Sequence, residues 1–141
     1  MLKTIIEASQ NFCIHQIRVP HEIHENISQM RTLIAYIDIE TRDKKSHRVY
    51  LCASPSFAQR ISTLYLEEDE SDEETLIDMM LETANQIVGS AKVIAEVSNE
   101  NPFVICTPHF EKIDKFDFDY DQAKVVKIEN DEMIIAIKEL S

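Results

Sequence analysis

Four residues of one segment, Asp78, Glu82, Asn85 and Gly89, are spaced so that they could act together on another molecule. Their separations of four, three and four residues place them on one side of an α-helix, because a helix turns by about 100° per residue. A carboxylate and a carboxamide on that side could enter one pocket together, and a carboxamide can hold water through both its oxygen and its NH₂ group. The spacing alone does not name a reaction.

The segment that carries these residues has the periodicity of an amphipathic helix. Ser71 and Glu74 form a capping box, which predicts a helix start there and a helix that continues to about Ile94. Eight apolar residues fall within an arc of about 140° and form the predicted buried stripe: Leu76, Ile77, Met80, Leu81, Ala84, Ile87, Val88 and Ala91. The four residues of the first paragraph lie on the opposite side and form an exposed row, which we call the outer ridge.

Two residues of the outer ridge are poor helix formers. Glycine in a helix costs about 1 kcal/mol relative to alanine, and Gly89 is the only glycine among 141 residues. Asn85 is also unfavourable, because its amide competes for backbone hydrogen bonds. A surface that another molecule approaches closely would account for both residues. The alternative is a merely solvated helix face, since in so acidic a chain a glutamate three residues before an asparagine is expected by chance.

The composition excludes several classes of function. The chain has 26 acidic and 14 basic residues, and its net charge of −12 repels nucleic acids and anionic membrane surfaces. No apolar stretch approaches the roughly 20 residues that cross a bilayer, and the N-terminus lacks a signal pattern, so we expect a cytoplasmic protein. A single glycine also excludes a Walker loop or a dinucleotide fingerprint, both of which need several.

Neither the cysteines nor the histidines are spaced as metal ligands. The chain contains three isolated cysteines: Cys13, Cys52 and Cys106. Each has apolar neighbours, so we expect reduced residues that fill the core. Three histidines follow the first cysteine: His15, His21 and His24. Their spacing matches no common zinc pattern and Pro20 interrupts the helical frame, so we expect no metal site in this chain.

The rest of the chain alternates between helical spacing and the two-residue alternation of β-strands. Helices are predicted from Leu2 to about Ile17 and from Ser54 to Leu66. Strands are predicted over 33–39 and 49–53 as a hairpin, over 103–106, and over 124–128 and 133–138 as a closing hairpin. The acidic run Glu67–Glu74 is predicted to be a solvated connection. This order predicts one α+β domain over residues 1–141, an antiparallel sheet with long helices packed on one face.

The run from Asp78 to Lys92 resembles the signature of the CheC, CheX and FliY family of chemotaxis phosphatases, a Glu-x-x-Asn on a long helix followed four residues later by glycine. Three further features occur in the family order. They are the helix from Ser54 to Leu66 after a strand, the acidic run Glu67–Glu74 before the long helix, and Ile105-Cys106-Thr107-Pro108, which is similar to a family strand ending in Thr-Pro. The resemblance covers Leu33 to about Glu111. One motif-bearing helix and a length near 140 residues are most similar to CheX, which implies a CheC-like fold.

The resemblance implies an enzyme that hydrolyses the aspartyl phosphate of a CheY-type response regulator in two-component chemotaxis signalling. It implies that Asn85 orients the attacking water and that Glu82 pairs with the active-site lysine of the receiver, while Asp78, Gln86 and Gly89 contact that partner. These roles are chemically reasonable, because phosphoryl transfer depends on positioning more than on a general base. The Mg²⁺ would be held by the receiver, so this chain needs no cofactor of its own. CheX proteins also pair through a sheet edge, which implies a homodimer.

The sequence departs from the family in its loops. A charged connection, 41–46, and the segment Phe110-Glu111-Lys112 stand where the family usually has glycines. The acidic run Glu67–Glu74 before the long helix is also longer than expected. These changes affect loop shapes and the dimer edge rather than Glu82 or Asn85. Glu7-Ala8-Ser9-Gln10 repeats the motif with glutamine in place of asparagine, but no glycine follows, so a second working site is not expected.

Two other functions remain open from the sequence. The same ridge would serve a non-catalytic module that binds the receiver or docks in the flagellar switch, and it would also be compatible with a dimerising structural domain. The sequence does not identify the receiver, nor does it show whether the acidic run from Glu67 to Glu74 steers basic partner surfaces toward the ridge.

Overall fold

The structure is a computed structural model that describes residues 1–98 and 101–140. Its helical elements are α1 (Leu2–Phe12), the π-helical turn η1 (Cys13–Ile17), α2 (Pro55–Leu66) and α3 (Glu73–Ser98). Its strands are β1 (Glu22–His24), β2 (Arg31–Thr41), β3 (Ser46–Ala53), β4 (Phe103–Ile105), β5 (His109–Lys115), β6 (Gln122–Ile128) and β7 (Asp131–Glu139).

These strands form an antiparallel sheet that joins the two predicted hairpins. The order is β1-β6-β7-β3-β2-β4, and β5 also pairs with β2. The hairpin β2-β3 meets the hairpin β6-β7 through pairing of β3 with β7. Strand β2 is long enough to pair with β5 along residues 31–36 and with β4 along residues 39–41. The sheet therefore joins strands that range from residue 22 to residue 139 in one layer.

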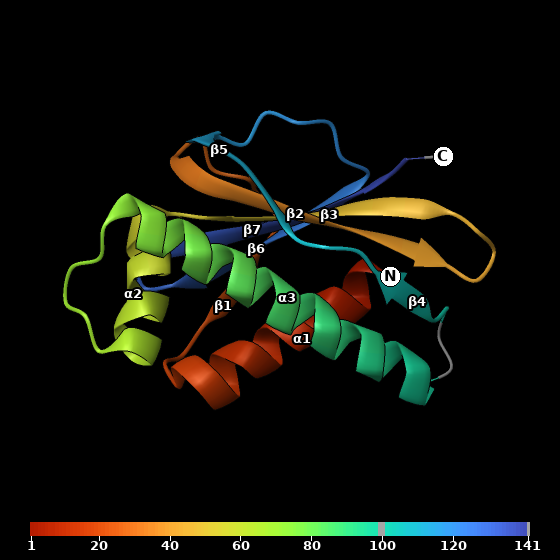
Figure 1. Cartoon of the computed structure of the whole chain (residues 1–141), viewed down its shortest axis with the longest axis horizontal. Coiled ribbons are helices and arrows are strands. Elements are labelled where there is room, and N and C mark those ends of the chain that lie inside the picture. The colour runs from red at the N-terminus through yellow and green to blue at the C-terminus, as the bar shows by residue number, and fades with distance from the viewer. Residues whose placement is uncertain (99–100, 141) are drawn as a thin grey trace.

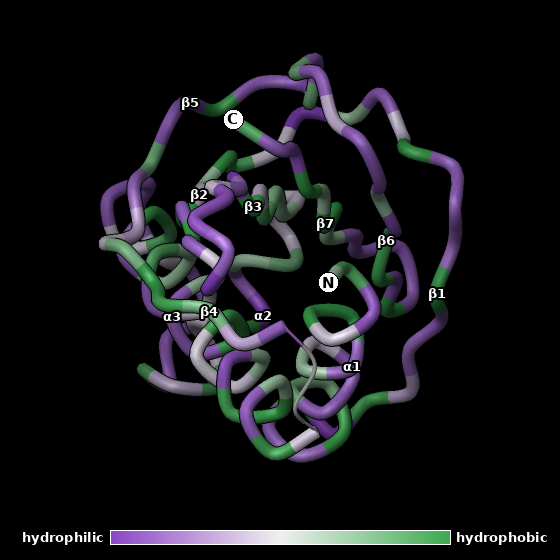
Figure 2. Tube along the Cα trace, turned by 90° about the vertical axis from the view of Figure 1, so that its right-hand side faces the viewer, coloured by the Kyte–Doolittle hydropathy of each residue, from purple (hydrophilic) through white to green (hydrophobic). Residues whose placement is uncertain are grey.

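The helices lie on one side of this sheet (Figure 1), as the sequence predicts. Figure 2 shows α1, α2 and α3 gathered below the central strands β2, β3, β7 and β6. The main apolar core lies between the layers and includes Ile5, Phe57 and Ile87. The other face of the sheet is covered by aromatic side chains, because Phe116 and Phe118 each lie with their ring centroids 5.2 Å from that of Tyr50. The α+β architecture is thus confirmed.

The start of α2 is attached to the sheet by one serine. Ser54 Oγ accepts hydrogen bonds from the backbone N–H of Phe57 at 3.3 Å and of Glu132 at 3.2 Å. The first bond caps the helix, as predicted from Ser54 and Pro55, and the second joins the cap to β7. One side chain therefore fixes where α2 leaves the sheet.

The helix α3 begins one residue later than the predicted capping box places it. Asp72 Oδ1, rather than the Ser71 hydroxyl, accepts the hydrogen bond from the backbone N–H of Thr75, at 2.8 Å. Ser71 points back toward α2 and its hydroxyl bonds that of Ser62. The contact between helices takes the serine away from the cap, and the aspartate that follows replaces it.

Three further expectations differ from the structure. The first helix gives way to the π-helical turn after Phe12 and ends at Arg18, whose backbone is left-handed with φ 63°. The short strand β1 and the strand β5 were not predicted, because their residues show only weak alternation. Cys106 is exposed, whereas Cys13 and Cys52 are buried as expected, and burial raises the pKa of the Cys13 thiol to about 11.

The cap of α3 makes the stability of the fold depend on pH in a defined direction. The hydrogen bond from Thr75 lowers the pKa of Asp72 below its ordinary 3.8. Its contribution is therefore fully present above that ordinary value and is lost as the pH falls through the lower value of the folded state. We predict that Asp72→Ala lowers the free energy of unfolding at pH 7 and reduces the further loss on acidification to pH 3, measured by urea titration. Asp69→Ala, an exposed acid of the same run, is the control, and identical behaviour of the two variants would contradict the assignment.

Candidate functional site

The outer ridge faces away from the core. Asp78, Glu82 and Asn85 are exposed and Gly89 is partly exposed, as the sequence predicts. The opposite side of α3 packs on α1, α2 and the sheet. Its buried residues are Met79, Met80, Thr83, Ala84, Ile87, Val88, Ala91 and Ala95. Three members of the predicted stripe are only partly buried: Leu76, Ile77 and Leu81.

Two small residues inside the motif set the rotation of the helix. Thr83 and Ala84 have exposed fractions of 1% and 0%. The Thr83 hydroxyl donates to the carbonyl of Met79 at 2.7 Å, so its polar group is satisfied within the core. Because each residue advances the helix by about 100°, burial of these two places Glu82 and Asn85 on the outer side. The carboxylate and the carboxamide therefore project together, and both residues are exposed.

The fold does not require a glycine at position 89. A Cβ atom built on Gly89 would meet no atom within 4 Å of other parts of the chain. Left-handed backbone, which favours glycine, occurs in the described residues at five other positions. They are Arg18, Lys44, Glu67, Asn101 and Glu129. The only glycine of the chain thus lies where it weakens a helix and relieves no internal strain.

A tyrosine from α2 lies beside the ridge, which the sequence did not indicate. Tyr65 Oη lies 3.3 Å from the Oε1 of Gln86 and 3.3 Å from that of Gln16, so it joins α3 to η1. Burial raises the pKa of Tyr65, and the nearby carboxylate of Glu82 raises it further. Gln86, which follows Asn85 directly, is therefore held in place on the side of the ridge that faces α1. The only signal in the sequence was an apolar run at the end of α2.

The connection between α2 and α3, which leads to the outer ridge, carries a strong negative charge. The residues of the acidic run from Glu67 to Glu70 are exposed in the connection between α2 and α3, and the first turn of α3 adds Glu73 and Glu74. Asp78 and Glu82 extend the negative charge along the helix. Such a surface attracts a positively charged partner and increases its association rate.

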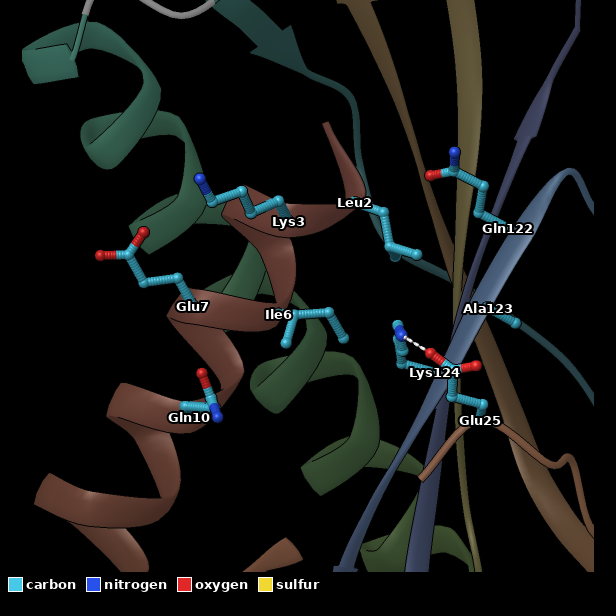
Figure 3. Close-up of a pocket in the computed structure, with 9 residues that line it drawn as sticks. All are labelled: Leu2, Lys3, Ile6, Glu7, Gln10, Glu25, Gln122, Ala123 and Lys124. Atoms are coloured by element: carbon cyan, nitrogen blue, oxygen red, sulfur yellow. Dashed lines mark hydrogen bonds and ion pairs between the residues drawn. The ribbon is translucent and has the colours of Figure 1, made fainter. Parts of the chain in front are cut away.

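The Glu7–Gln10 motif lies on α1, beside a hollow of about 770 Å³ between α1 and β6. Figure 3 shows Leu2 and Ile6 pointing from α1 toward the sheet, whereas Lys3 and Glu7 point away from it. An ion pair between Lys124 of β6 and Glu25 borders the far side. Glu7 is exposed and Gln10 partly exposed, but the chain has no second glycine to follow them.

The histidines and cysteines are dispersed. Within residues 1–98 and 101–140, no group of three or more His, Cys, Asp or Glu side chains is arranged to hold a metal ion. His24 Nε2 lies 3.0 Å from Glu22 Oε2 in β1, whereas Cys13 is buried in the core. In the same described part of the chain, no helix combines the length and the apolar character needed to span a membrane.

The comparisons with known proteins identify the family and the fold of the chain. The family model described as chemotaxis phosphatase CheX matches residues 35–134, which include all of α2 and α3. The chain therefore belongs to the CheX family. No curated protein matches the chain significantly.

Solved structures of low sequence identity share the fold. CheX from Vibrio vulnificus superposes with a TM-score of 0.77 at 15% identity, covering 97% of each chain. CheX from Desulfovibrio desulfuricans gives a TM-score of 0.76 at 15% identity, covering 98% of this chain and 97% of the other. A chain of the CheX-CheY-BeF₃-Mg²⁺ complex from Borrelia burgdorferi gives 0.68 at 13% identity, covering 98% and 97%. These matches confirm the CheC-like architecture.

The environment of Gly89 predicts a gain in stability when a side chain is added. We expect Gly89→Ala to increase the free energy of unfolding by up to about 1 kcal/mol, because alanine is the better helix former and nothing obstructs its methyl group. Urea denaturation measures this difference. Glu82→Ala, an exposed substitution on the same ridge, should stay within about 0.5 kcal/mol of the wild type. A destabilised Gly89→Ala variant would show that the fold itself needs the glycine.

Proposed function

We propose that this chain is a protein phosphatase that hydrolyses the aspartyl phosphate of a CheY-type response regulator. The observation that carries the proposal is the joint projection of Glu82 and Asn85 from the exposed side of α3, next to a glycine that the fold does not need. Membership of the family described as chemotaxis phosphatases supports the reaction. The related fold in the Borrelia burgdorferi complex with CheY, BeF₃ and Mg²⁺ supports the partner.

In this proposal Asn85 positions the attacking water. Its carboxamide accepts a hydrogen bond through the oxygen and donates through the NH₂ group, so it can hold the water in line with the breaking bond. The water oxygen forms a bond to phosphorus while the bond between phosphorus and the aspartyl oxygen breaks, leaving a free carboxylate and inorganic phosphate. The loose transition state of phosphoryl transfer makes such positioning the main contribution.

Glu82 has a docking role in the same proposal. Its carboxylate lies one helical turn from Asn85 on the exposed side, where it can meet the active-site lysine of a receiver. An exposed ion pair contributes little in water, but the pair becomes stronger and more directional when docking excludes solvent. Asp78, Gln86 and Gly89 would surround this contact. The Mg²⁺ that assists phosphoryl transfer would be held by the acids of the receiver, so the proposed reaction requires no cofactor bound by this chain.

The proposal places the protein in the cytoplasm with its receiver, as a homodimer formed through a sheet edge. In the described part of the chain β5 pairs with β2 alone, so the other side of this seven-residue strand can pair with a second copy. Because α3 itself contacts the edge strands β4 and β5, docking in such a dimer would use the outer side of α3, from which Glu82 and Asn85 project.

Removal of the Asn85 carboxamide should slow hydrolysis. We predict that Asn85→Ala lengthens the lifetime of the aspartyl phosphate on a cognate receiver on the order of 10²-fold relative to the wild-type protein, because the water is no longer held in line. Decay of the radiolabelled phosphoryl-receiver measures this lifetime. Asn26→Ala, at an exposed asparagine away from α3, is the matched control. Equal lifetimes with Asn85→Ala and wild type would reject catalysis by this residue, and binding by the wild type without acceleration would favour the docking module.

Removal of the Glu82 carboxylate should weaken docking more than chemistry. We expect Glu82→Ala to slow turnover at low receiver concentration and to recover toward the wild-type rate as the receiver concentration rises, which is an increase in KM at a similar kcat. Glu96→Ala is the control, at a glutamate of the same helix that lies 4.0 Å from Lys92. A dependence on receiver concentration that is the same for wild type and Glu82→Ala would count against the docking role.

A further inference from the structure

A groove beside the outer ridge has the character of a docking site. Its volume is about 390 Å³, and it lies between α1, η1 and α3. Its floor is apolar, because Ala8, Phe12 and Ile87 have exposed fractions of 1%, 6% and 1%. Its rims carry amide and hydroxyl groups, including those of Asn11 and Ser90. Such a groove suits an apolar side chain presented by a polar backbone segment.

Tyr65 lines one end of the groove, and its two neighbours in the chain are exposed apolar residues. Its hydroxyl lies 3.3 Å from the amide oxygens of both Gln16 and Gln86 and can donate its one hydrogen to either, so it links the two rims at this end. Its exposed fraction is 37%, and those of Leu64 and Leu66 on either side are 43% and 46%. In Figure 1 this end of α2 lies beside the end of α1 that leads into η1. Exposed apolar side chains near a groove are a feature of many interaction surfaces.

The groove is continuous with the outer ridge. Gln86 follows Asn85, and Ser90 follows Gly89, so the same two turns of α3 form the ridge and one wall of the groove. Because Gly89 has no side chain and its Cβ position is open among the described residues, no side chain at position 89 separates the ridge from that wall. A molecule that places a group against Asn85 therefore also lies over the groove.

We propose that the groove binds a surface segment of the phosphorylated receiver, one that inserts an apolar side chain between α1 and α3 and carries basic residues beside it. This inference rests on the proposed function and deepens it, since it assigns part of the specificity for the receiver to a surface outside the Glu82–Asn85 pair. The exposed acids that follow Leu66, from Glu67 to Glu70, lie next in the chain to the end of the groove that Tyr65 lines and select the basic flank by charge.

Filling the groove tests the proposal without changing the ridge. Ser90→Trp adds a large side chain at the exposed rim, and Ser98→Trp, at an exposed serine two turns further along α3, is the matched control. We expect Ser90→Trp to raise the KM for the phosphoryl-receiver and the Kd for the beryllofluoride-activated receiver at least tenfold, with kcat at saturating receiver unchanged. The control should behave as the wild type. Urea denaturation of each variant verifies that it is folded.

A second, independent variant removes the aromatic ring of Tyr65 at the end of the groove. Tyr65→Ala should raise the same KM and Kd, whereas Tyr65→Phe, which keeps the ring, should retain most of the wild-type affinity. Tyr120→Ala is the matched control at a tyrosine that is 46% exposed on the opposite layer of the molecule. A merely structural role for Tyr65 would lower stability and leave the Kd of the folded protein unchanged.

The outcomes separate this inference from the proposed function. If the wild type hydrolyses and binds the receiver, but Ser90→Trp and Tyr65→Ala do so with unchanged KM and Kd, the groove proposal is overturned and the proposed function stands. If the wild type neither binds nor hydrolyses the receiver, both fall. Sedimentation of the chain alone tests the other occupant, because dissociation of a dimer by Ser90→Trp would identify the groove as a contact between two copies and overturn binding of the receiver.

Discussion

The burial of Thr83 and Ala84 between α3 and the rest of the core is the constraint on which the site depends. These two residues lie between Glu82 and Asn85, and the helical period allows the flanking pair to face solvent only if the intervening pair faces inward. The hydroxyl of Thr83 is satisfied by the carbonyl of Met79, so burial leaves no unpaired donor. The rotation of the helix is thus held by core packing, and the exposure of Glu82 and Asn85 needs no support from neighbouring loops.

The single glycine does not occupy any of the left-handed backbone positions, where glycine would be favoured. Arg18, Lys44 and Glu67 adopt left-handed conformations that glycine would adopt at lower cost, yet the chain uses other residues there. Gly89 instead lies in a regular helix with open space around its Cβ position. The chain therefore tolerates strain at its turns, while its only glycine is kept on the surface that a partner would approach.

This side of the molecule has two parts, an acidic surface and a groove with an apolar floor. The connection before α3 and the outer ridge are acidic, which acts at long range on a basic partner. The groove between α1 and α3 has an apolar floor and acts only on contact. Asn85 lies where the two parts meet, so a partner attracted by the first would be oriented by the second.

The sequence by itself determined the rotation of α3, the two hairpins and the start of α2. Each of these follows from a local pattern that acts over a few residues. Helical spacing exposes the ridge from Asp78 to Gly89, the alternation of residues within β2 and within β3 predicts the first hairpin, and Ser54 caps α2. Family resemblance then supplied the chemistry proposed for Glu82 and Asn85, which spacing alone did not name.

Only the tertiary structure decided which distant segments meet. The pairing of β5 with β2, the exposure of Cys106, and the contact of Tyr65 with Gln86, 21 residues away in the chain, depend on packing between elements and leave no periodic signal. The cap of α3 shows the same limit, since Ser71 matched the local pattern but is drawn to Ser62 of a neighbouring helix. Local patterns fix the face that an element buries, whereas the neighbour that covers it is selected by the energy of the whole core.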